Sequence, residues 1–292
     1  MRLGTRGSAL ALAQATPIAQ KLGAELVTIS TEGDRSTEPL SAIGGTGVFA
    51  TALRDALLAG EVDVVVHSLK DLPTAPHPGL AIGAIPQRAD ARDAVCARDT
   101  LTLDTLPAGA RVGTGSPRRA AQLRSRRPDL AVLDIRGNVD TRLGKVASGE
   151  YDAVILAAAG LDRLHRLDAV TEYLDIEGWP TAPGQGALAV EVRTGDEKLV
   201  KSLDHATSRI VAQAERRTLA LLEAGCSAPV GAHAVVDDGM LFLSVRVYGP
   251  ASHVTSSHAL YVSDSKDPAG DIAERVAKEL FDLGAAELMG AS

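Results

Sequence analysis

Aromatic side chains are scarce in this 292-residue chain, since Phe, Tyr and Trp make up 3% of it and Trp occurs once. The core must therefore be built from Ala, Val, Leu and Ile, and a surface of aromatic rings for stacking nucleic-acid bases is disfavoured. Hydrophobic residues at 45% and charged residues at 23% are typical of a globular protein with a substantial core. A net charge of −7 repels nucleic acids and anionic membranes, so we expect neither as a partner.

Cysteines and long apolar runs are also few. Cys96 and Cys226 are the only cysteines, too few for a disulfide framework and compatible with a reducing cytoplasm. Neither has a partner at zinc-site spacing, so we expect no metal site. No stretch approaches the roughly 18 apolar residues of a membrane span. Near the N-terminus an apolar run follows two arginines, but it is short and Gln14 interrupts it, which disfavours a cleaved signal peptide.

Short apolar runs alternate with helical patterns over the first two-thirds of the chain. The predicted strands are residues 25–31, 62–68, 80–85, 111–116, 130–137, 151–160 and 186–193, and the predicted helices are residues 8–21, 47–59, 117–127 and 139–148. Several of these strands are apolar on both faces, which is typical of sheets that helices cover on both sides. The pattern therefore predicts an α/β architecture.

The pattern changes after about residue 205. The predicted elements there are a long helix over 207–225, a hairpin within 234–249, a strand over 258–263 and a helix near 268–284. Gly225 is expected just past the end of the long helix. This part of the chain is predicted to form a separate α+β domain, with linkers near 86–92 and 194–206.

Arginine supplies 23 of the 30 basic residues, and five arginines stand in TGSPRRAAQLRSRRP, residues 114–128. Ser116 is a good N-cap and Pro117 suits the first helical position. Arg118 and Arg119 then fall in the first turn, where positive side chains are unfavourable. We therefore expect an anion at this helix terminus, bound by the helix amides and the two guanidinium groups.

Arg136 and Arg142 repeat this arrangement around a second predicted N-cap, Asn138. All four arginines follow the ends of predicted strands, where ligands of open α/β sheets lie. The alternative is a solvated basic face, because residues 111–145 carry a local charge of +6. We favour that alternative only for the arginines at the end of the first helix, which are Arg124, Arg126 and Arg127.

The segment VDVVVHSLKDLP, residues 62–73, brings polar residues to the end of an apolar strand. Lys70 and Asp71 stand just before a proline break, where they suit either a ligand site or a simple salt bridge. Lys70 is one of only seven lysines and is the better candidate for a ligand contact. His67 is interpreted as a packed strand residue.

Cys226 lies in EAGCSAPVG, beyond the end of the predicted long helix. The C-terminal end of a helix dipole raises the pKa of a thiol, so a conventional cysteine nucleophile is disfavoured there. From the residues alone Cys226 is as well explained as a small buried thiol. Cys96, within DAVCARD, is interpreted as structural.

Taken together, the motifs resemble those of the porphobilinogen deaminase family, whose members are also called hydroxymethylbilane synthases. The matching segments, in the family's order, are GTRGSALALAQA, VVVHSLKDLPT, RDAV, GTGSPRRAAQL, DIRGNVDTRL, YDAVILAAAGLDRL, APGQGALAVEVR and EAGCSAPVGA. The resemblance extends over roughly residues 2 to 290, and the combination of motifs is highly specific.

The resemblance implies three domains in a monomer: two that are similar to the halves of a type II periplasmic binding protein, and a C-terminal α+β domain. The implied bounds are 1–86 with 187–204 for the first domain, 92–181 for the second and 206–292 for the third. The first domain is thus interrupted by the second. Its site is expected in a cleft lined with arginines.

The resemblance also implies the reaction. A dipyrromethane cofactor is held by a thioether to Cys226, which needs no thiolate poised for repeated turnover. Four porphobilinogen molecules are added to it head to tail, each with loss of ammonia, and hydrolysis releases the linear tetrapyrrole hydroxymethylbilane. Every pyrrole carries an acetate and a propionate, which explains the arginines in an acidic protein.

Residue roles follow from the same resemblance. Asp71 matches the catalytic aspartate, whose carboxylate can bind pyrrole N–H groups and stabilise the cation formed as ammonia departs. The expected cofactor-binding residues are Cys226, Lys70, Asp71, Ser116, Arg118 and Arg119. The expected substrate-binding residues are Arg6, Ser8, Arg136, Arg142, Arg163 and Phe49. Phe49 is interpreted either as a packing partner of the cofactor or as core.

The chain departs from the family pattern at Ala42 and Thr46, where lysines are frequent, and at Gly115, where serine is common. The lysine changes fall in an expected mobile loop over 34–47.

Two other classes of protein are alternatives to this family. A non-catalytic binding protein for a small carboxylated ligand would share the two-lobed fold but needs neither Cys226 nor Asp71. An effector-sensing regulatory protein would need a nucleic-acid module, and no segment has its charge or motif.

Overall fold

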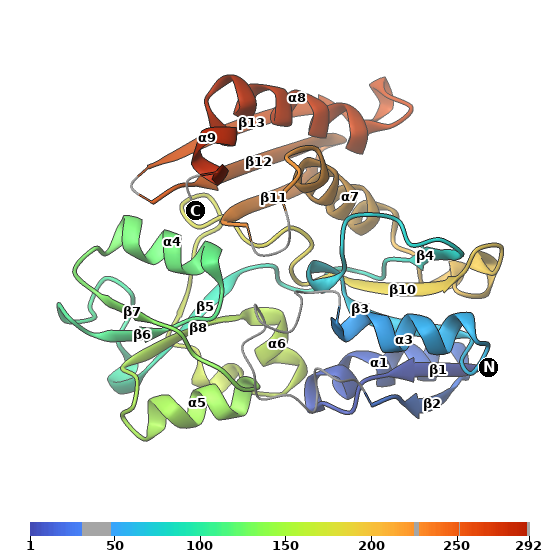
Figure 1. The fold of residues 1–292 in the computed structure, drawn as a ribbon, viewed down its shortest axis with the longest axis horizontal. Helices are drawn as coiled ribbons and strands as arrows, with labels where there is room; N and C mark the ends of the chain where they lie inside the picture. The colour runs from blue at the N-terminus through green and yellow to red at the C-terminus, as the bar shows by residue number, and fades with distance from the viewer. Residues whose placement is uncertain (31–47, 225–227, 251, 291–292) are drawn as a thin grey trace.

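Three β-sheets organise the chain, as Figure 1 shows. The computed structural model describes residues 1–30, 48–224, 228–250 and 252–290. We call lobe 1 the sheet of order β2-β1-β3-β10-β4 with its helices, lobe 2 the sheet of order β7-β6-β8-β5-β9 with its helices, and lobe 3 the sheet of order β11-β12-β13 with its helices. The prediction of an α/β protein with a C-terminal α+β part is confirmed.

Lobe 1 is built on both sides of lobe 2 in the chain. Its elements are β1 (Arg2–Thr5), α1 (Ala9–Leu22), β2 (Glu25–Thr28), α3 (Val48–Leu58), β3 (Val64–Ser68), β4 (Leu80–Ala84) and β10 (Leu188–Arg193). β1 was not predicted, and β2 ends at Thr28, earlier than expected. β10 enters the sheet antiparallel to its neighbours β3 and β4.

Lobe 2 has the same plan. Its elements are β5 (Asp93–Ala97), β6 (Arg111–Gly113), α4 (Pro117–Arg126), β7 (Ala131–Leu133), α5 (Val139–Ala147), β8 (Ala153–Ala157), α6 (Ala158–Arg163) and β9 (Glu172–Tyr173). The strand predicted over 151–160 was too long, because the chain turns into α6 at Ala158. β5 and β9 were not predicted, and β6 and β7 are shorter than expected.

The two sheets share one topology. In each, three parallel strands are joined by helices, and the next strand of the sheet runs antiparallel to them. That strand is β10 in lobe 1 and β5 in lobe 2, and each comes directly after the chain has crossed between the lobes. This is the doubled arrangement that the resemblance implied. Buried clusters lie on both faces of each sheet, as the apolar strands predicted.

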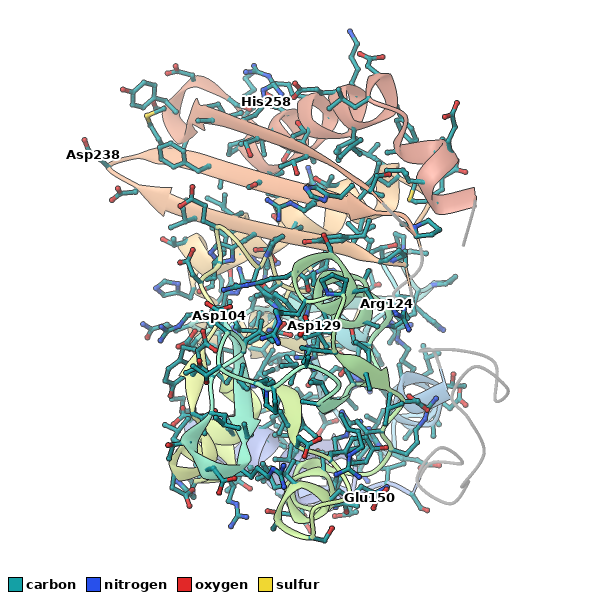
Figure 2. The ribbon with its side chains drawn as sticks, turned by 90° about the vertical axis from the view of Figure 1, so that its left-hand side faces the viewer. Asp104, Arg124, Asp129, Glu150, Asp238 and His258 are labelled. Carbon is teal, nitrogen blue, oxygen red and sulfur yellow. The ribbon has the colours of Figure 1, made fainter. Side chains whose placement is uncertain are left out.

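Lobe 3 packs two long helices on a three-stranded antiparallel sheet. Its elements are α7 (Ala206–Leu221), β11 (Val230–Asp237), β12 (Met240–Tyr248), β13 (His253–Tyr261), α8 (Pro268–Asp282) and α9 (Ala285–Gly290). The predicted hairpin is confirmed: Asp238 and Gly239 both have positive φ, as a tight hairpin turn requires, and Figure 2 shows Asp238 at its tip. In Figure 1, α7 lies between this sheet and lobe 1.

The end of α7 differs from the prediction. The helix stops at Leu221, and Glu223 takes the left-handed conformation with φ of 52°. The Glu223 amide donates to the Ala220 carbonyl and the Ala224 amide to the Leu219 carbonyl, which together close the last turn. The expectation that Gly225 terminates the helix was therefore wrong, since these backbone bonds are satisfied before it.

Candidate active site

The strand β3 ends in the turn that carries Lys70 and Asp71. Residues Leu69–Asp71 form one turn of 3-10 helix directly after Ser68. Leu69 is fully buried and fixes the turn in the core, whereas Asp71 is exposed. The packing of one side chain thus leaves the next two available for a ligand. His67 is buried in β3 with its Nε2 3.3 Å from a Glu191 carboxylate oxygen, so its interpretation as a packed strand residue is confirmed.

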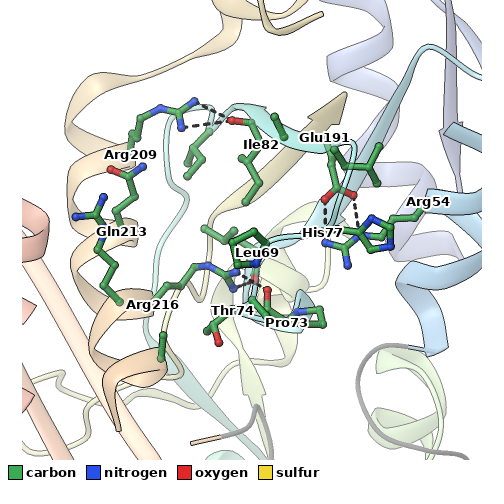
Figure 3. A pocket seen from close by; sticks show the side chains of 17 residues that line it. Arg54, Leu69, Pro73, Thr74, His77, Ile82, Glu191, Arg209, Gln213 and Arg216 are labelled. Atoms are coloured by element: carbon green, nitrogen blue, oxygen red, sulfur yellow. Dashed lines mark hydrogen bonds and ion pairs between the residues drawn. The ribbon is translucent and has the colours of Figure 1, made fainter. Parts of the chain in front are cut away.

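Arg216 of α7 holds this turn from behind, as Figure 3 shows. Its guanidinium group donates to the carbonyls of Leu69 at 3.0 Å, Leu72 at 2.8 Å and Pro73 at 2.7 Å. These bonds form one wall of a pocket between α7 and lobe 1. Within this pocket Arg209 donates to the Gly83 carbonyl and Glu191 accepts from Arg54. Arg209 and Arg216 thus join α7 to lobe 1, whereas the pair of Arg54 and Glu191 lies within lobe 1.

The N-terminus of α4 is built as the sequence predicted. The Ser116 hydroxyl accepts from the Arg119 amide, and Pro117 occupies the first turn. Arg118 and Arg119 are only 3% and 6% exposed, which excludes a solvated basic face for them. Their anion is supplied by the chain itself: Arg118 Nη2 lies 2.8 Å from Asp93 Oδ2, and Arg119 Nη2 lies 2.6 Å from Asp93 Oδ1.

A second pocket joins the three lobes. Its lining includes Lys70 from lobe 1, Ser116 and Arg118 from lobe 2, and Arg216 and Ala228 from lobe 3. Three of the predicted cofactor-binding residues therefore meet in one place. Ala228 stands two positions after Cys226 in the sequence. Asp71 follows Lys70 in the same turn, and its side chain is exposed.

Two buried nitrogen atoms of this arginine pair lack partners. Arg118 Nε and Arg119 Nε are shielded from solvent and make no hydrogen bond within the described residues. A buried unpaired donor on a charged group is costly unless a further acceptor completes it. Carboxylates suit this role, because guanidinium groups bind them in charge-assisted hydrogen bonds.

Lys70 is electrostatically part of the same cluster. Burial lowers its pKa to about 8, Asp71 and Asp93 act to raise it, and the nearby guanidinium groups lower it further. Its Nζ lies 3.4 Å from Gln185 Oε1, on the segment that returns from lobe 2 to lobe 1. Near neutral pH Lys70 is therefore a cation that desolvation disfavours, which an anionic ligand would stabilise.

The remaining predicted arginines lie around this cluster in lobe 2. Burial together with the charges of Arg119 and Arg136 lowers the pKa of Arg142, which donates to the Gly137 carbonyl. Arg136 is exposed and pairs with Asp134 at 3.0 Å. Both stand around Asn138, whose side chain caps α5 as predicted.

Three further residues lie at the start of α1 and at the end of α6, two helices that contact each other across the lobes. Ser8 accepts from the Ala11 amide and caps α1. Arg6 is half-buried just before it, beyond the end of β1. Arg163 ends α6, donates to the Gly186 carbonyl at 2.8 Å, and has a pKa lowered by burial. Because α1 and α6 are in contact, these residues come from opposite sides of the junction between lobes 1 and 2.

Some predicted features lie elsewhere or outside the described residues. Cys226, the side chain of Phe49 and the segment with Ala42 and Thr46 lie outside them. Arg124 and Arg126 are exposed as expected, and Figure 2 shows Arg124 at the surface of lobe 2. Arg127 is not simply solvated, because it donates to the carbonyls of Leu103 and Leu106. Cys96 is buried in β5, where its pKa is raised to about 12, as its structural interpretation predicted.

Sequence reasoning did not single out Asp93, Gln185 or Arg216. Asp93 and Gln185 are buried and contact the arginine pair, and Arg216 contacts the Lys70 turn. The sequence offered two signals for them. Asp93 is an acidic residue at the start of the apolar run in RDAV, and Gln185 is a polar residue within GQGAL. No group of three or more metal-ligating side chains occurs in the described part of the chain, and no helix there is long and apolar enough to cross a membrane.

Two family models cover almost the entire chain. Residues 1–201 match "Porphobilinogen deaminase, dipyromethane cofactor binding domain", and residues 210–282 match "Porphobilinogen deaminase, C-terminal domain". The chain belongs to the porphobilinogen deaminase family. It is therefore a transferase of tetrapyrrole synthesis that acts on porphobilinogen, with a dipyrromethane cofactor, as the resemblance implied.

Curated relatives agree over their full lengths. The chain is 58% identical to a porphobilinogen deaminase of Leifsonia xyli subsp. xyli, with 99% of this chain and 94% of the relative covered. It is 53% identical to the porphobilinogen deaminase of Mycobacterium tuberculosis, with 99% and 98% covered. A porphobilinogen deaminase 1 of Streptomyces coelicolor is 50% identical, with 99% and 97% covered. These matches favour the enzyme over a non-catalytic binding protein.

Solved structures give a weaker likeness. A putative methionine-binding lipoprotein of Bacillus subtilis is 13% identical with a TM-score of 0.40, covering 69% of this chain and 86% of its own. A probable amino-acid transporter binding protein of the same species is 14% identical with a TM-score of 0.40, covering 76% and 95%. The conclusion that lobes 1 and 2 share one topology is drawn from their own strand orders and not from this likeness.

Proposed function

We propose that the second pocket and its surroundings are the site at which this porphobilinogen deaminase holds its cofactor and extends the chain. The observation that carries the proposal is that Lys70, Ser116 and Arg118 line one pocket beside Ala228, which follows Cys226 by two positions. The charge of the neighbouring Arg119 also acts on Lys70. Four porphobilinogen molecules are joined here head to tail, each losing ammonia, and water releases the product. The proposed divisions are 1–86 with 187–204, 92–181 and 206–292, supported by the three sheets.

The residues around this pocket fit a group that carries several carboxylates. Arg118 Nε and Arg119 Nε are buried donors without a described acceptor, and Lys70 is a desolvated cation beside them. With Ser116 at the same helix terminus, they would bind the acetate and propionate groups of the cofactor, and Cys226 would hold it through a thioether. When bound, the cofactor supplies the pyrrole carbon to which the first substrate is joined.

Asp71 is proposed as the catalytic residue. As ammonia leaves the aminomethyl group of porphobilinogen, positive charge develops on the remaining pyrrole, and a carboxylate nearby stabilises that charge. The new carbon–carbon bond then displaces a proton from the acceptor pyrrole carbon, which Asp71 can accept and pass to solvent because it is exposed. The aminomethyl group starts as an ammonium group and leaves as ammonia, and the proton displaced from the acceptor carbon is equivalent to the one that ammonia takes up in solvent, so each addition releases one ammonium ion.

The other predicted residues are proposed to bind the carboxylates of the incoming substrate and of the growing chain. They are Arg6, Ser8, Arg136, Arg142 and Arg163, with Phe49 as an apolar contact. Their placement on both sides of the junction between lobes 1 and 2 supports this role, since each added pyrrole brings two more carboxylates. A monomeric, cytoplasmic enzyme is proposed from the family and from the low cysteine content.

The proposal is tested by weighing the denatured protein. Wild type is expected to be heavier than its sequence by two linked pyrrole units, and Cys226→Ser is expected at its plain mass. Cys96→Ser is the matched control, because Cys96 is buried in β5, and it should keep the added mass.

A preparation without added mass would then be incubated with porphobilinogen and weighed again. Covalent mass gain that depends on Cys226 supports the proposal. An unmodified protein that gains no mass from porphobilinogen would sink it, and added mass on the Cys226→Ser variant would show that the attachment point is wrong.

A further inference from the structure

The carboxylate of Asp93 lies at the edge of lobe 2 that faces the site. Asp93 is the first residue of β5 and pairs with Ala157, the last residue of β8. It is fully buried and follows directly after the linker that enters lobe 2. Ligands of α/β sheets lie beyond the carboxyl ends of the parallel strands, so Asp93 sits beneath the ligand side of the sheet.

Four side-chain donors saturate this carboxylate, two from α4 and two from the segment that returns to lobe 1. Oδ2 accepts from Arg118 Nη2 at 2.8 Å and from the Trp179 indole at 2.9 Å. Oδ1 accepts from Arg119 Nη2 at 2.6 Å and from Gln185 Nε2 at 2.8 Å. Asp93 therefore has no acceptor capacity left for a ligand in this arrangement, and it acts only on its neighbours.

The bonds to Asp93 also decide how the two guanidinium groups lie. Arg118 Nη1 is held by Gln122 and by the Pro180 carbonyl, and Arg119 Nη1 is held by the Ile155 carbonyl. Only the two Nε atoms lack partners among the described residues. One carboxylate thus orients both guanidinium groups, and the Nε atom of each is left without an acceptor among the described residues.

The charge of Asp93 is equally important. Burial alone would raise its pKa, but Arg118 and Arg119 outweigh burial and hold the pKa well below its usual range. Asp93 is therefore ionised near neutral pH. Two buried guanidinium groups with one carboxylate carry a net charge of +1, whereas without it two like charges would face each other in a water-poor site.

Asp93 also reaches Lys70 through Gln185. Gln185 Nε2 donates to Asp93 and to the Ala91 carbonyl, which turns Oε1 toward Lys70 Nζ at 3.4 Å and Arg119 Nη2 at 3.5 Å. The two catalytic lobes are thereby linked through one side-chain amide. The charged groups that act on Lys70 are Asp71 and Asp93, which favour its cation, and Arg118 and Arg119, which oppose it.

We propose that Asp93 is a positioning residue of the reaction: it is the shared counter-charge that orients Arg118 and Arg119 for the pyrrole carboxylates and, through Gln185, sets the acceptor that faces Lys70. This inference rests on the proposed function. It assigns no contact between Asp93 and the substrate.

The test is Asp93→Asn in the full-length chain. Asparagine keeps the shape, but its amide places donors against a guanidinium donor and removes the charge. Loading is measured first, as the rate at which cofactor-free protein gains covalent mass from porphobilinogen, and it is expected to fall. In loaded enzyme KM is expected to rise about 10- to 100-fold, the usual effect of losing a hydrogen bond to a charged group. The alkaline limb of kcat/KM is expected at lower pH, because the Lys70 cation loses a stabilising charge.

Asp152→Asn is the matched control. Asp152 is also a buried aspartate of lobe 2 that contacts two arginines, with Oδ1 3.0 Å from Arg98 and Oδ2 3.3 Å from Arg111. It stands just before Ala153, at the opposite end of β8 from Asp93. Its variant should lose thermal stability while the loading rate, KM and the pH profile stay at wild-type values.

The outcomes separate cleanly. If Asp93→Asn loads at the wild-type rate and keeps the KM and pH profile of Asp152→Asn, Asp93 is merely structural and the inference is overturned. If Asp93→Asn does not fold, Trp179→Phe decides, since it removes one donor from Asp93 Oδ2 and leaves both arginines. That variant should slow loading and raise KM, and wild-type behaviour would overturn the inference. Failure of the wild type to gain mass from porphobilinogen would instead overturn the proposed function.

Discussion

Replacing Glu215 by glutamine should weaken the attachment of lobe 3 to the segments that join lobes 1 and 2. Glu215 lies on α7 and is fully buried. Its Oε1 accepts from Arg88 Nη1 at 2.7 Å and its Oε2 from Arg88 Nη2 at 3.0 Å. The amides of Gly184 at 2.6 Å and Ala234 at 2.8 Å complete its shell. Arg88 belongs to the linker into lobe 2 and Gly184 to the return segment, so one carboxylate joins both crossings to lobe 3.

The magnitude follows from the loss of a buried charge. Breaking one partner of a buried ion pair costs about 3–5 kcal/mol, because the remaining charge stays uncompensated. The usual unfolding entropy of about 2.1 cal/mol/K per residue gives about 0.6 kcal/mol/K for a chain of this length. The melting temperature of Glu215→Gln should therefore fall by about 5–8 °C.

Thermal unfolding followed by circular dichroism measures this shift. The control is Glu279→Gln, whose carboxylate on the exposed face of α8 accepts from Ser256 and His258. It should melt close to wild type, because exposed pairs contribute little. A Glu215→Gln protein that melts within about 1 °C of wild type would refute the reasoning, since it would show that the buried network adds no net stability.

Three further outcomes are expected. Asp71→Asn should fold normally and lower kcat by about 10²- to 10⁴-fold in steady-state assays, the usual contribution of a positioned acid–base group; an unchanged kcat would assign the proton transfer elsewhere. Because burial lowers the pKa of Lys70 to about 8 and only its cation binds carboxylates, kcat/KM should fall as the pH rises through about 8. Lys70→Arg should lose that limb, and an unaltered profile would rule out Lys70 as its origin. Because burial raises the pKa of Cys96 to about 12, native Cys226→Ser should not react with iodoacetamide near neutral pH but should react once unfolded, as mass spectrometry reports.

Local signals predicted several elements well. Ser116 and Pro117 mark the start of α4, and Asp238 with Gly239 mark the turn between β11 and β12. In both cases the responsible contacts lie within a few residues of each other. The pattern is therefore visible in the sequence before any tertiary structure forms.

Other elements depended on distant partners. The run AVILAAAG fits a strand or a helix equally well, and only the end of sheet pairing at Ala157 decides that α6 starts at Ala158. β5 is only five residues long, and its sequence alone did not predict a strand. It becomes a strand because it pairs with β8 on one side and β9 on the other. Short segments of this kind take their structure from the sheet that receives them.

In the site, too, some features follow from local sequence and others from contacts with distant residues. The arginines were predicted from their place at a helix terminus, but their counter-charge Asp93 stands 25 and 26 positions away in the sequence. Arg216 reaches carbonyls 143 to 147 positions away. Such pairings follow from how the lobes pack on each other, and no local pattern in the sequence encodes them.

The interleaving of lobes 1 and 2 has a consequence for synthesis on the ribosome. β10 lies between β3 and β4, so β4 has no partner in its sheet until residue 193 has emerged. The sheet of lobe 2, which ends at Tyr173, can close first. A nascent chain of about the first 90 residues would leave β4 unpaired and one edge of β3 open, which favours association with other chains. Lobe 1 begins the chain but is completed after lobe 2. A truncated chain that ends before β10 should therefore be a target for chaperones.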